Sequence, residues 1–184
     1  GSAIYGGNTS GSTYGMKWGR GIGIDFSIGL GDTKRNRIYV GGEWNAMINA
    51  NSSNIPFLLI SPSEAILTYY NIYSLEAGYQ YMWNARCKTK QWFTAGLSAS
   101  IIQAPRYSVV NFEDATRGGA FAQYGYDFVL DQAGKWGLSL SAKYHLVNAF
   151  FHANGNNTQA HINDGNGLPG PGYDRLIGLL SINV

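Results

Sequence analysis

Apolar and polar residues alternate strictly through most of this chain. From Ile22 to Leu30 every second residue is apolar, while the residues between them are glycine, serine and Asp25. A period of two is typical of a β-strand that has one face toward an apolar environment and the other toward a polar one. The pattern recurs in runs at 14–30, 38–48, 74–83, 93–101, 120–130, 136–146 and 173–184. The sequence therefore predicts an all-β protein.

The lengths of these runs point to a membrane. Most runs have about 11–17 residues, whereas strands of soluble proteins average about 5–6 residues and a tilted strand needs about 9–11 to cross a bilayer. The connections alternate between short ones (31–36, 84–90, 131–134) and long ones (51–64, 105–117, 151–172). Short periplasmic turns and long extracellular loops are typical of outer-membrane barrels. We therefore expect a closed antiparallel transmembrane β-barrel of eight strands.

Seven runs leave the expected barrel one strand short, because antiparallel closure needs an even number. Three explanations remain open at this point. Residues 1–13 supply a short first strand, a strand lies inside 51–70, or the chain lacks a native N-terminal piece. The whole of 1–184 is otherwise expected to form one domain.

The composition excludes several other classes of protein. The single cysteine rules out an intrachain disulfide framework and a multi-cysteine zinc site. A net charge of +2 is too small to indicate a nucleic-acid partner. The longest apolar run, Ile55 to Ile60, is too short for a transmembrane helix.

The hairpins 65–104 and 118–150 and the final run 173–184 resemble the small, roughly eight-stranded outer-membrane β-barrel superfamily of Gram-negative bacteria. The resemblance implies a location in the bacterial outer membrane after removal of a signal peptide. It also implies contact with outer-membrane lipid and lipopolysaccharide, and leaves room for other envelope proteins as partners.

The polar faces of the runs carry a set of charged residues. In a barrel of about eight strands this face fills the interior with side chains, and charges there are expected to pair because unpaired buried charge is costly. We predict a polar network that plugs the lumen rather than an ion path or a catalytic cluster. Its members are Asp25, Glu43, Glu76, Asp127, Lys143, His145 and Arg175.

Two further groups of residues are predicted to act at the surface. Tryptophans at the short-turn ends of strands are expected to form an interfacial aromatic girdle; they are Trp83, Trp92 and Trp136. An apolar stretch in a predicted extracellular loop is a candidate contact site for a partner. It contains Ile55, Phe57, Leu58, Leu59 and Ile60.

The predicted function is non-enzymatic, with no cofactor and no metal: a small integral barrel that acts through its long loops on surfaces, ligands or a larger envelope complex. The alternatives are a narrow pore, a lipid A-modifying enzyme and a soluble barrel or lectin-like binder. The His-x-Ser motif of the lipid A deacylases is absent, since Leu146 and Val147 follow His145. A metal site from His152, His161 and Asp164 is a further alternative. A soluble binder would turn its apolar residues inward.

Overall fold

A computed structural model of the chain describes residues 2–5, 18–49, 68–85, 87–103, 114–130, 136–151, 153–154, 172–173 and 176–184. All regular secondary structure in these ranges is β-strand, so the prediction of an all-β protein is confirmed. Within the same ranges there is no helix of the length and apolarity needed to span a membrane.

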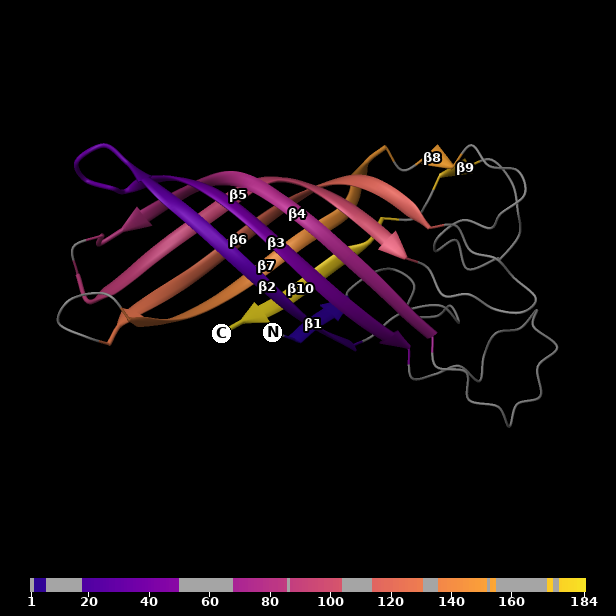
Figure 1. Cartoon of the computed structure of the whole chain (residues 1–184), viewed down its shortest axis with the longest axis horizontal. Helices are drawn as coiled ribbons and strands as arrows, with labels where there is room; N and C mark the ends of the chain where they lie inside the picture. Colours follow the sequence, from indigo (N-terminus) through magenta and orange to yellow (C-terminus); the bar gives the residue numbers. More distant parts are fainter. Residues whose placement is uncertain are drawn as a thin grey trace.

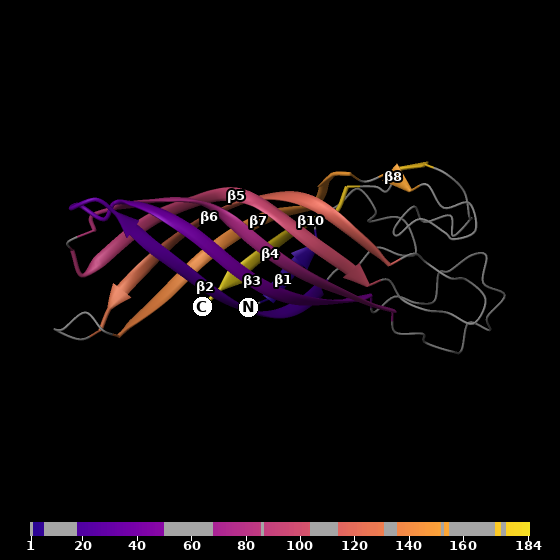
Figure 2. The ribbon, with the colours of Figure 1, turned by 45° about the horizontal axis from the view of Figure 1, so that its top comes forward.

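Seven antiparallel strands of the described chain form a single curled sheet (Figures 1 and 2). They are β2 (Trp18–Leu30), β3 (Asn36–Asn49), β4 (Thr68–Trp83), β5 (Thr89–Gln103), β6 (Ala115–Val129), β7 (Gly137–Phe150) and β10 (Gly178–Asn183). Consecutive strands from β2 to β7 pair as hairpins, and β10 pairs with β7. The fold therefore follows the chain order, as the alternating connections predict.

Three short strands complete the described structure. The four-residue β1 (Ser2–Tyr5) pairs antiparallel with β10 on one side and with β2 on the other. It lies in the range 1–13 where one of the three explanations placed a short first strand. The remaining pair, β8 (Ala153–Asn154) and β9 (Gly172–Tyr173), forms a small sheet of its own.

Several strand boundaries differ from the sequence prediction, and those of β4 and β10 differ most clearly. β4 begins at Thr68, earlier than the expected 74, because residues 68–71 pair with residues 49–46 of β3 and prolong the hairpin. β10 begins only at Gly178, although the last run was predicted from 173. In that segment Gly172 and Tyr173 pair with β8 instead.

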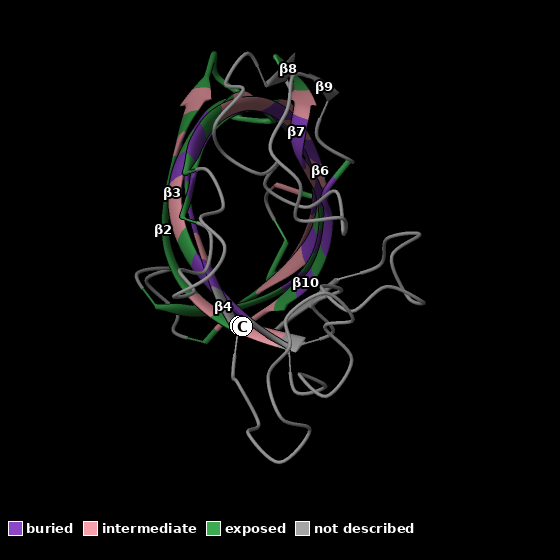
Figure 3. Cartoon of the chain, turned by 90° about the vertical axis from the view of Figure 1, so that its right-hand side faces the viewer, coloured by how far each residue is buried: buried purple, intermediate pink, exposed green. Residues whose placement is uncertain are grey.

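The two faces of the sheet differ sharply in chemistry. The apolar residues of the alternating runs point outward and are exposed, among them Ile22 (72%), Leu75 (65%) and Leu97 (63%). The opposite face is buried and rich in polar side chains, including Ser74, Gln80 and Thr94. In the end-on view, buried and exposed positions alternate along the ribbons around a common interior (Figure 3). The inside of the curled sheet therefore carries these polar residues together with apolar ones such as Ile72, Ile102 and Val147.

Candidate functional site

Inside the sheet, two carboxylates converge on one lysine. Lys143 on β7 donates hydrogen bonds from Nζ to both carboxylate oxygens of Glu76 on β4, at 3.0 and 3.3 Å, and to Glu43 Oε2 on β3. The exposed fractions of the Lys143 and Glu76 side chains are only 5% and 1%. Because β7 is not a neighbour of β3 or β4 in the sheet, this ion pair crosses the interior.

The alternation of each strand explains why these groups meet. Glu43 pairs with Ser74, and Glu76 pairs with Gly41, so the two carboxylates lie diagonally on the same face of the β3–β4 hairpin. Diagonal neighbours of this kind lie about 7–8 Å apart at the backbone, within reach of long side chains. Lys143 is long enough to approach both of them from the opposite wall.

His145 extends the cluster along β7. Its Nδ1 lies 3.3 Å from Glu43 Oε1 and 3.7 Å from Glu76 Oε1, and its Nε2 lies 2.7 Å from Ser98 Oγ on β5. Both ring nitrogens therefore have partners. We call Glu43, Glu76, Lys143 and His145 the lumen cluster.

Ser98, His145 and Glu43 present a hydroxyl, an imidazole and a carboxylate in succession. In a catalytic triad these groups serve as the nucleophile, its general base and the acid that orients the base. Here, however, Ser98 is 8% exposed and His145 is 1% exposed, so an external substrate does not reach the hydroxyl in this conformation. Glu43 is also neutralised by Lys143. The arrangement is best explained as mutual satisfaction of buried polar groups, which are costly when left without partners.

A tyrosine connects the lumen cluster to Asp25. Tyr39 on β3 is 2% exposed, and its hydroxyl lies 2.7 Å from Asp25 Oδ1 and 3.1 Å from Glu76 Oε2. The hydroxyl carries one proton to share between two carboxylates. Four predicted network members thus form the lumen cluster, and a fifth, Asp25, joins it through Tyr39.

Asp127 lies in a separate group of contacts. Its Oδ1 accepts hydrogen bonds from the Trp92 indole nitrogen at 2.7 Å and from Ser139 Oγ at 2.8 Å. The placement of Trp92 in an outward girdle was therefore wrong, because its side chain is 6% exposed and faces the interior. Its register partner is Gly125, where a Cβ atom would lie 2.5 Å from the indole ring, so the glycine leaves room for the ring.

The other two predicted girdle residues point outward. Trp83 is 41% exposed and Trp136 is 75% exposed. Trp83 packs edge-on against Tyr81, with ring centroids 5.2 Å apart, and lies 6.4 Å from the Tyr124 ring. The ends of β4 and β6 beside the short turns thus carry a group of outward aromatic side chains.

Three residues of the lumen cluster have the chemistry of metal ligands. One ligand atom from each of Glu43, Glu76 and His145 lies within 4.8 Å of the others. The Lys143 ammonium group already binds both carboxylates, so it supplies the positive charge that a metal ion would bring. These residues therefore do not fit a metal site while Lys143 stays in place.

Several predicted residues lie outside the described ranges. They are Arg175, the loop residues Ile55, Phe57, Leu58, Leu59 and Ile60, and the alternative metal ligands His152, His161 and Asp164. Conversely, the sequence analysis did not select Tyr39 or Ser98 as site residues. Both lie on the polar faces of their runs, and this was the only signal available for them.

No protein-family model matches the chain, and neither a curated protein nor a solved structure shows significant similarity to it.

Proposed function

We propose that this chain is an integral outer-membrane protein: a closed, eight-stranded transmembrane β-barrel with a plugged lumen and no enzymatic activity. The observation that carries the proposal is the inverted distribution of polarity. Large apolar side chains cover the outer face of the sheet, while its interior buries the ion pair of Lys143 and Glu76 among polar and apolar side chains. A soluble barrel would have the opposite arrangement, because exposing this much apolar surface to water is unfavourable.

The strand geometry supports a membrane-spanning barrel. The strands from β2 to β7 have 13 to 16 residues, more than the about 9–11 that a tilted strand needs to cross a bilayer. In hydrocarbon every backbone polar group needs an internal partner, which favours closure of the sheet. The pairing of β1 with both β10 and β2 supports closure.

The lumen cluster supports a plug rather than a pore. Barrels of about eight strands have an interior just wide enough for side chains to fill it. Lys143, Glu76 and His145 are each at most 4% exposed, and Lys143 joins opposite walls of the sheet. Transport through the middle would require this buried ion pair to separate.

Because the proposed lumen is closed by side chains, we assign the activity of the protein to its long loops, which we place on the extracellular side. We propose that they contact surface ligands or other envelope proteins, while the barrel itself contacts outer-membrane lipid and lipopolysaccharide. The role of the barrel is then to anchor and space these loops.

The first experiment tests insertion. Protein refolded into octyl glucoside or phospholipid vesicles is expected to stay monodisperse only with the amphiphile, and to change its electrophoretic mobility on boiling. A matched sample diluted into buffer alone is expected to aggregate. A monodisperse sample in plain buffer would refute the membrane proposal.

The second experiment tests the plug. Planar bilayers that contain the refolded protein are expected to show no discrete current steps above the lipid background. Steps of uniform size in the wild-type protein would refute the plug and favour the narrow pore.

A further inference from the structure

The strands at the two ends of the chain are too short to fill their places in the barrel wall. β1 has four residues and β10 has six, whereas their outer neighbours β2 and β7 have 13 and 14. β1 pairs with β2 only as far as Arg20, and the last pair between β10 and β7 joins Asn183 to Ser141. β1 begins and β10 ends side by side, partway along β2 (Figure 1). These two strands therefore close only the part of the wall that lies toward the long loops.

An opening in the wall lies between this point and the short turns. On the side of β2 that faces β7, no described strand pairs with residues 22–30, and on the facing side of β7 none pairs with residues 137–140. In an antiparallel sheet every second residue directs both its N–H and its C=O toward the same neighbouring strand. The opening is therefore bordered by two strand edges with backbone donors and acceptors.

The burial of side chains along these edges agrees with the opening. Inward-facing residues of β3 are buried, for example Tyr39 and Asn45. The inward-facing Gly23 and Asp25 of β2 are exposed, and β7 is exposed on both faces from 137 to 140. The alternation of buried and exposed residues is thus lost along both borders, as expected where a neighbouring strand is missing.

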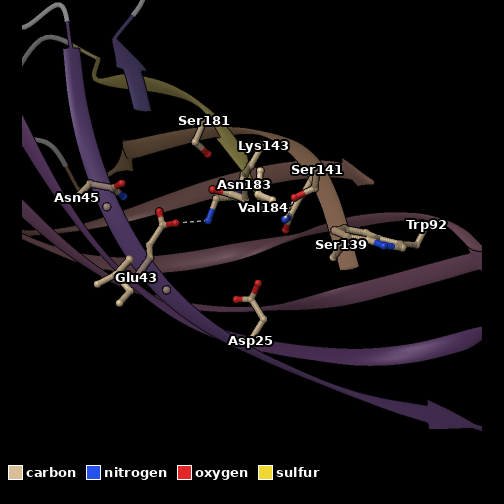
Figure 4. Close-up of a pocket in the computed structure, with 14 residues that line it drawn as sticks. Asp25, Glu43, Asn45, Trp92, Ser139, Ser141, Lys143, Ser181, Asn183 and Val184 are labelled. Carbon is tan, nitrogen blue, oxygen red and sulfur yellow. Dashed lines mark hydrogen bonds and ion pairs between the residues drawn. The ribbon is translucent and has the colours of Figure 1, made fainter. Parts of the chain in front are cut away.

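A hollow of about 270 Å³ reaches the opening from the interior. Its lining includes Ile22, an outward-facing residue of β2, together with Ser139 of β7 and Val184. In the close-up, the chain end at Asn183 and Val184 lies beside β7, and Asp25 of β2 lies across the hollow (Figure 4). The interior is therefore accessible through the side of the barrel.

We propose that this opening takes up a β-strand of another polypeptide, which pairs antiparallel with residues 22–30 of β2 and continues the line of β1. The proposal rests on the proposed membrane location, because backbone polar groups without partners are unfavourable in hydrocarbon. Addition of an extended segment to a free sheet edge is a recurrent mode of peptide recognition. The faces of β2 define the chemistry of the segment: apolar residues outward, beside Ile24 and Phe26, and small polar residues inward, beside Gly23 and Asp25.

A lipid and a second copy of the chain suit the opening less well. An acyl chain offers no donor or acceptor to the strand edges. Two copies with the same orientation in the membrane, related by a twofold axis along its normal, would pair their β2 strands in parallel. Every strand pairing in the described sheet is antiparallel, and parallel pairing is slightly less stable. Pairing of β2 with β7 of the next copy would use only residues 137–140.

The test is disulfide cross-linking to a probe peptide as long as the edge 22–30, which alternates valine and threonine and carries one cysteine in place of a valine. Ile24→Cys in a Cys87→Ser background places a thiol on the edge strand. Leu75→Cys in the same background is the matched control, because Ile24 and Leu75 are 63% and 65% exposed, but Leu75 lies between two paired strands. Both variants are refolded in nonionic detergent and oxidised with the peptide in excess. We expect at least tenfold more peptide adduct with Ile24→Cys than with Leu75→Cys.

Two control peptides test whether the adduct reflects strand pairing. One has the same side chains but a methyl group on every backbone nitrogen, so it has no N–H donors. The other carries its cysteine in place of a threonine, which in a paired strand points inward, away from residue 24. Both are expected to lose the adduct with Ile24→Cys.

Three outcomes would overturn the proposal. The first is an equal yield of adduct with Ile24→Cys and Leu75→Cys, and the second is an adduct that survives methylation of the peptide backbone. The third is a disulfide-linked dimer of Ile24→Cys that forms in preference to the peptide adduct, because it would assign the edge to a second copy.

The mobility shift on boiling and the requirement for detergent are measured on the same samples. Absence of the adduct in a protein that keeps both properties would refute this inference alone. Loss of both properties in the wild-type protein would refute the membrane proposal and, with it, the inference that rests on it.

Discussion

Replacement of Lys143 by methionine tests whether the lumen cluster holds the walls of the barrel together. Methionine has a similar length and removes only the ammonium group. Lys143 donates to Glu76 at 3.0 and 3.3 Å and also to Glu43. Lys143→Met therefore leaves two carboxylates facing each other without their shared cation.

The expected cost follows from burial. The Glu76 side chain is 1% exposed and that of Glu43 is 13% exposed, so water replaces the lost ammonium poorly. Removing one partner of a buried ion pair destabilises a protein by about 3–5 kcal/mol. With a urea dependence of about 2 kcal/mol per M, the midpoint of unfolding should fall by about 1.5–2.5 M.

The assay is urea unfolding of the protein in phospholipid vesicles, followed by tryptophan fluorescence. Lys88→Met is the matched control, because Lys88 is exposed in the β4–β5 turn and its loss should change the free energy of unfolding by less than about 0.5 kcal/mol. A triple variant that also carries Glu43→Gln and Glu76→Gln should recover part of the loss, since it leaves no unpaired charge.

Current measurements on Lys143→Met complete this test. Reduced stability with no discrete current is the expected result. Unchanged stability together with new or altered current steps would refute the reasoning, because a lysine in an open aqueous path affects ion flow without holding the walls together.

Three other predictions use separate parts of the barrel. Leu97→Arg, in the middle of the outer face, should destabilise the protein in vesicles by about 2–4 kcal/mol. Leu130→Arg, directly after β6, should cost about 0–1 kcal/mol. Equal costs of the two variants in urea unfolding would contradict lipid contact. Tyr39→Phe removes the hydroxyl that touches two carboxylates and should cost about 1.5–3 kcal/mol in the same assay, while a loss below 0.5 kcal/mol would show that the hydroxyl bonds are dispensable. The exposed Cys87 in a short turn should react with an impermeant maleimide only after the outer membrane of expressing cells is permeabilised. In a Cys87→Ser background, Phe151→Cys should react on intact cells. The reverse pattern would contradict the predicted placement of the short turns on the periplasmic side.

The alternation of residue types was sufficient to predict the strands and their faces. Every run from 14–30 to 136–146 contains or overlaps a strand of the structure. Successive side chains of a strand point to opposite faces, so only an extended strand places all the apolar residues of such a run on one face. The same phase placed Glu43, Glu76, Lys143 and His145 on one inner surface. The predicted positions of strand ends were less accurate, as at Thr68, where β4 begins six residues before the predicted run. Pairing with a neighbouring strand can prolong a strand beyond its alternating run.

The contacts within the interior depended on the tertiary structure. Nothing local links Lys143 to Glu43, which lies 100 residues away, and only the curl of the sheet brings β7 opposite β3 and β4. The same holds for Trp92, whose position at a strand end favoured an interfacial role. Its inward direction follows from the strand phase, and the room for its ring comes from Gly125 on the neighbouring strand.

The sequence by itself thus determined which residues share a face, since the direction of a side chain in a strand is a local property of the backbone. The tertiary structure alone decided which inner residues meet and which buried atoms, such as Gln123 Oε1, are left without a hydrogen-bond partner. These features depend on register and curvature, which are set by pairing between strands distant in the sequence. A one-residue change in the register of any hairpin would preserve the composition of the chain and yet turn every side chain of that strand to the other face.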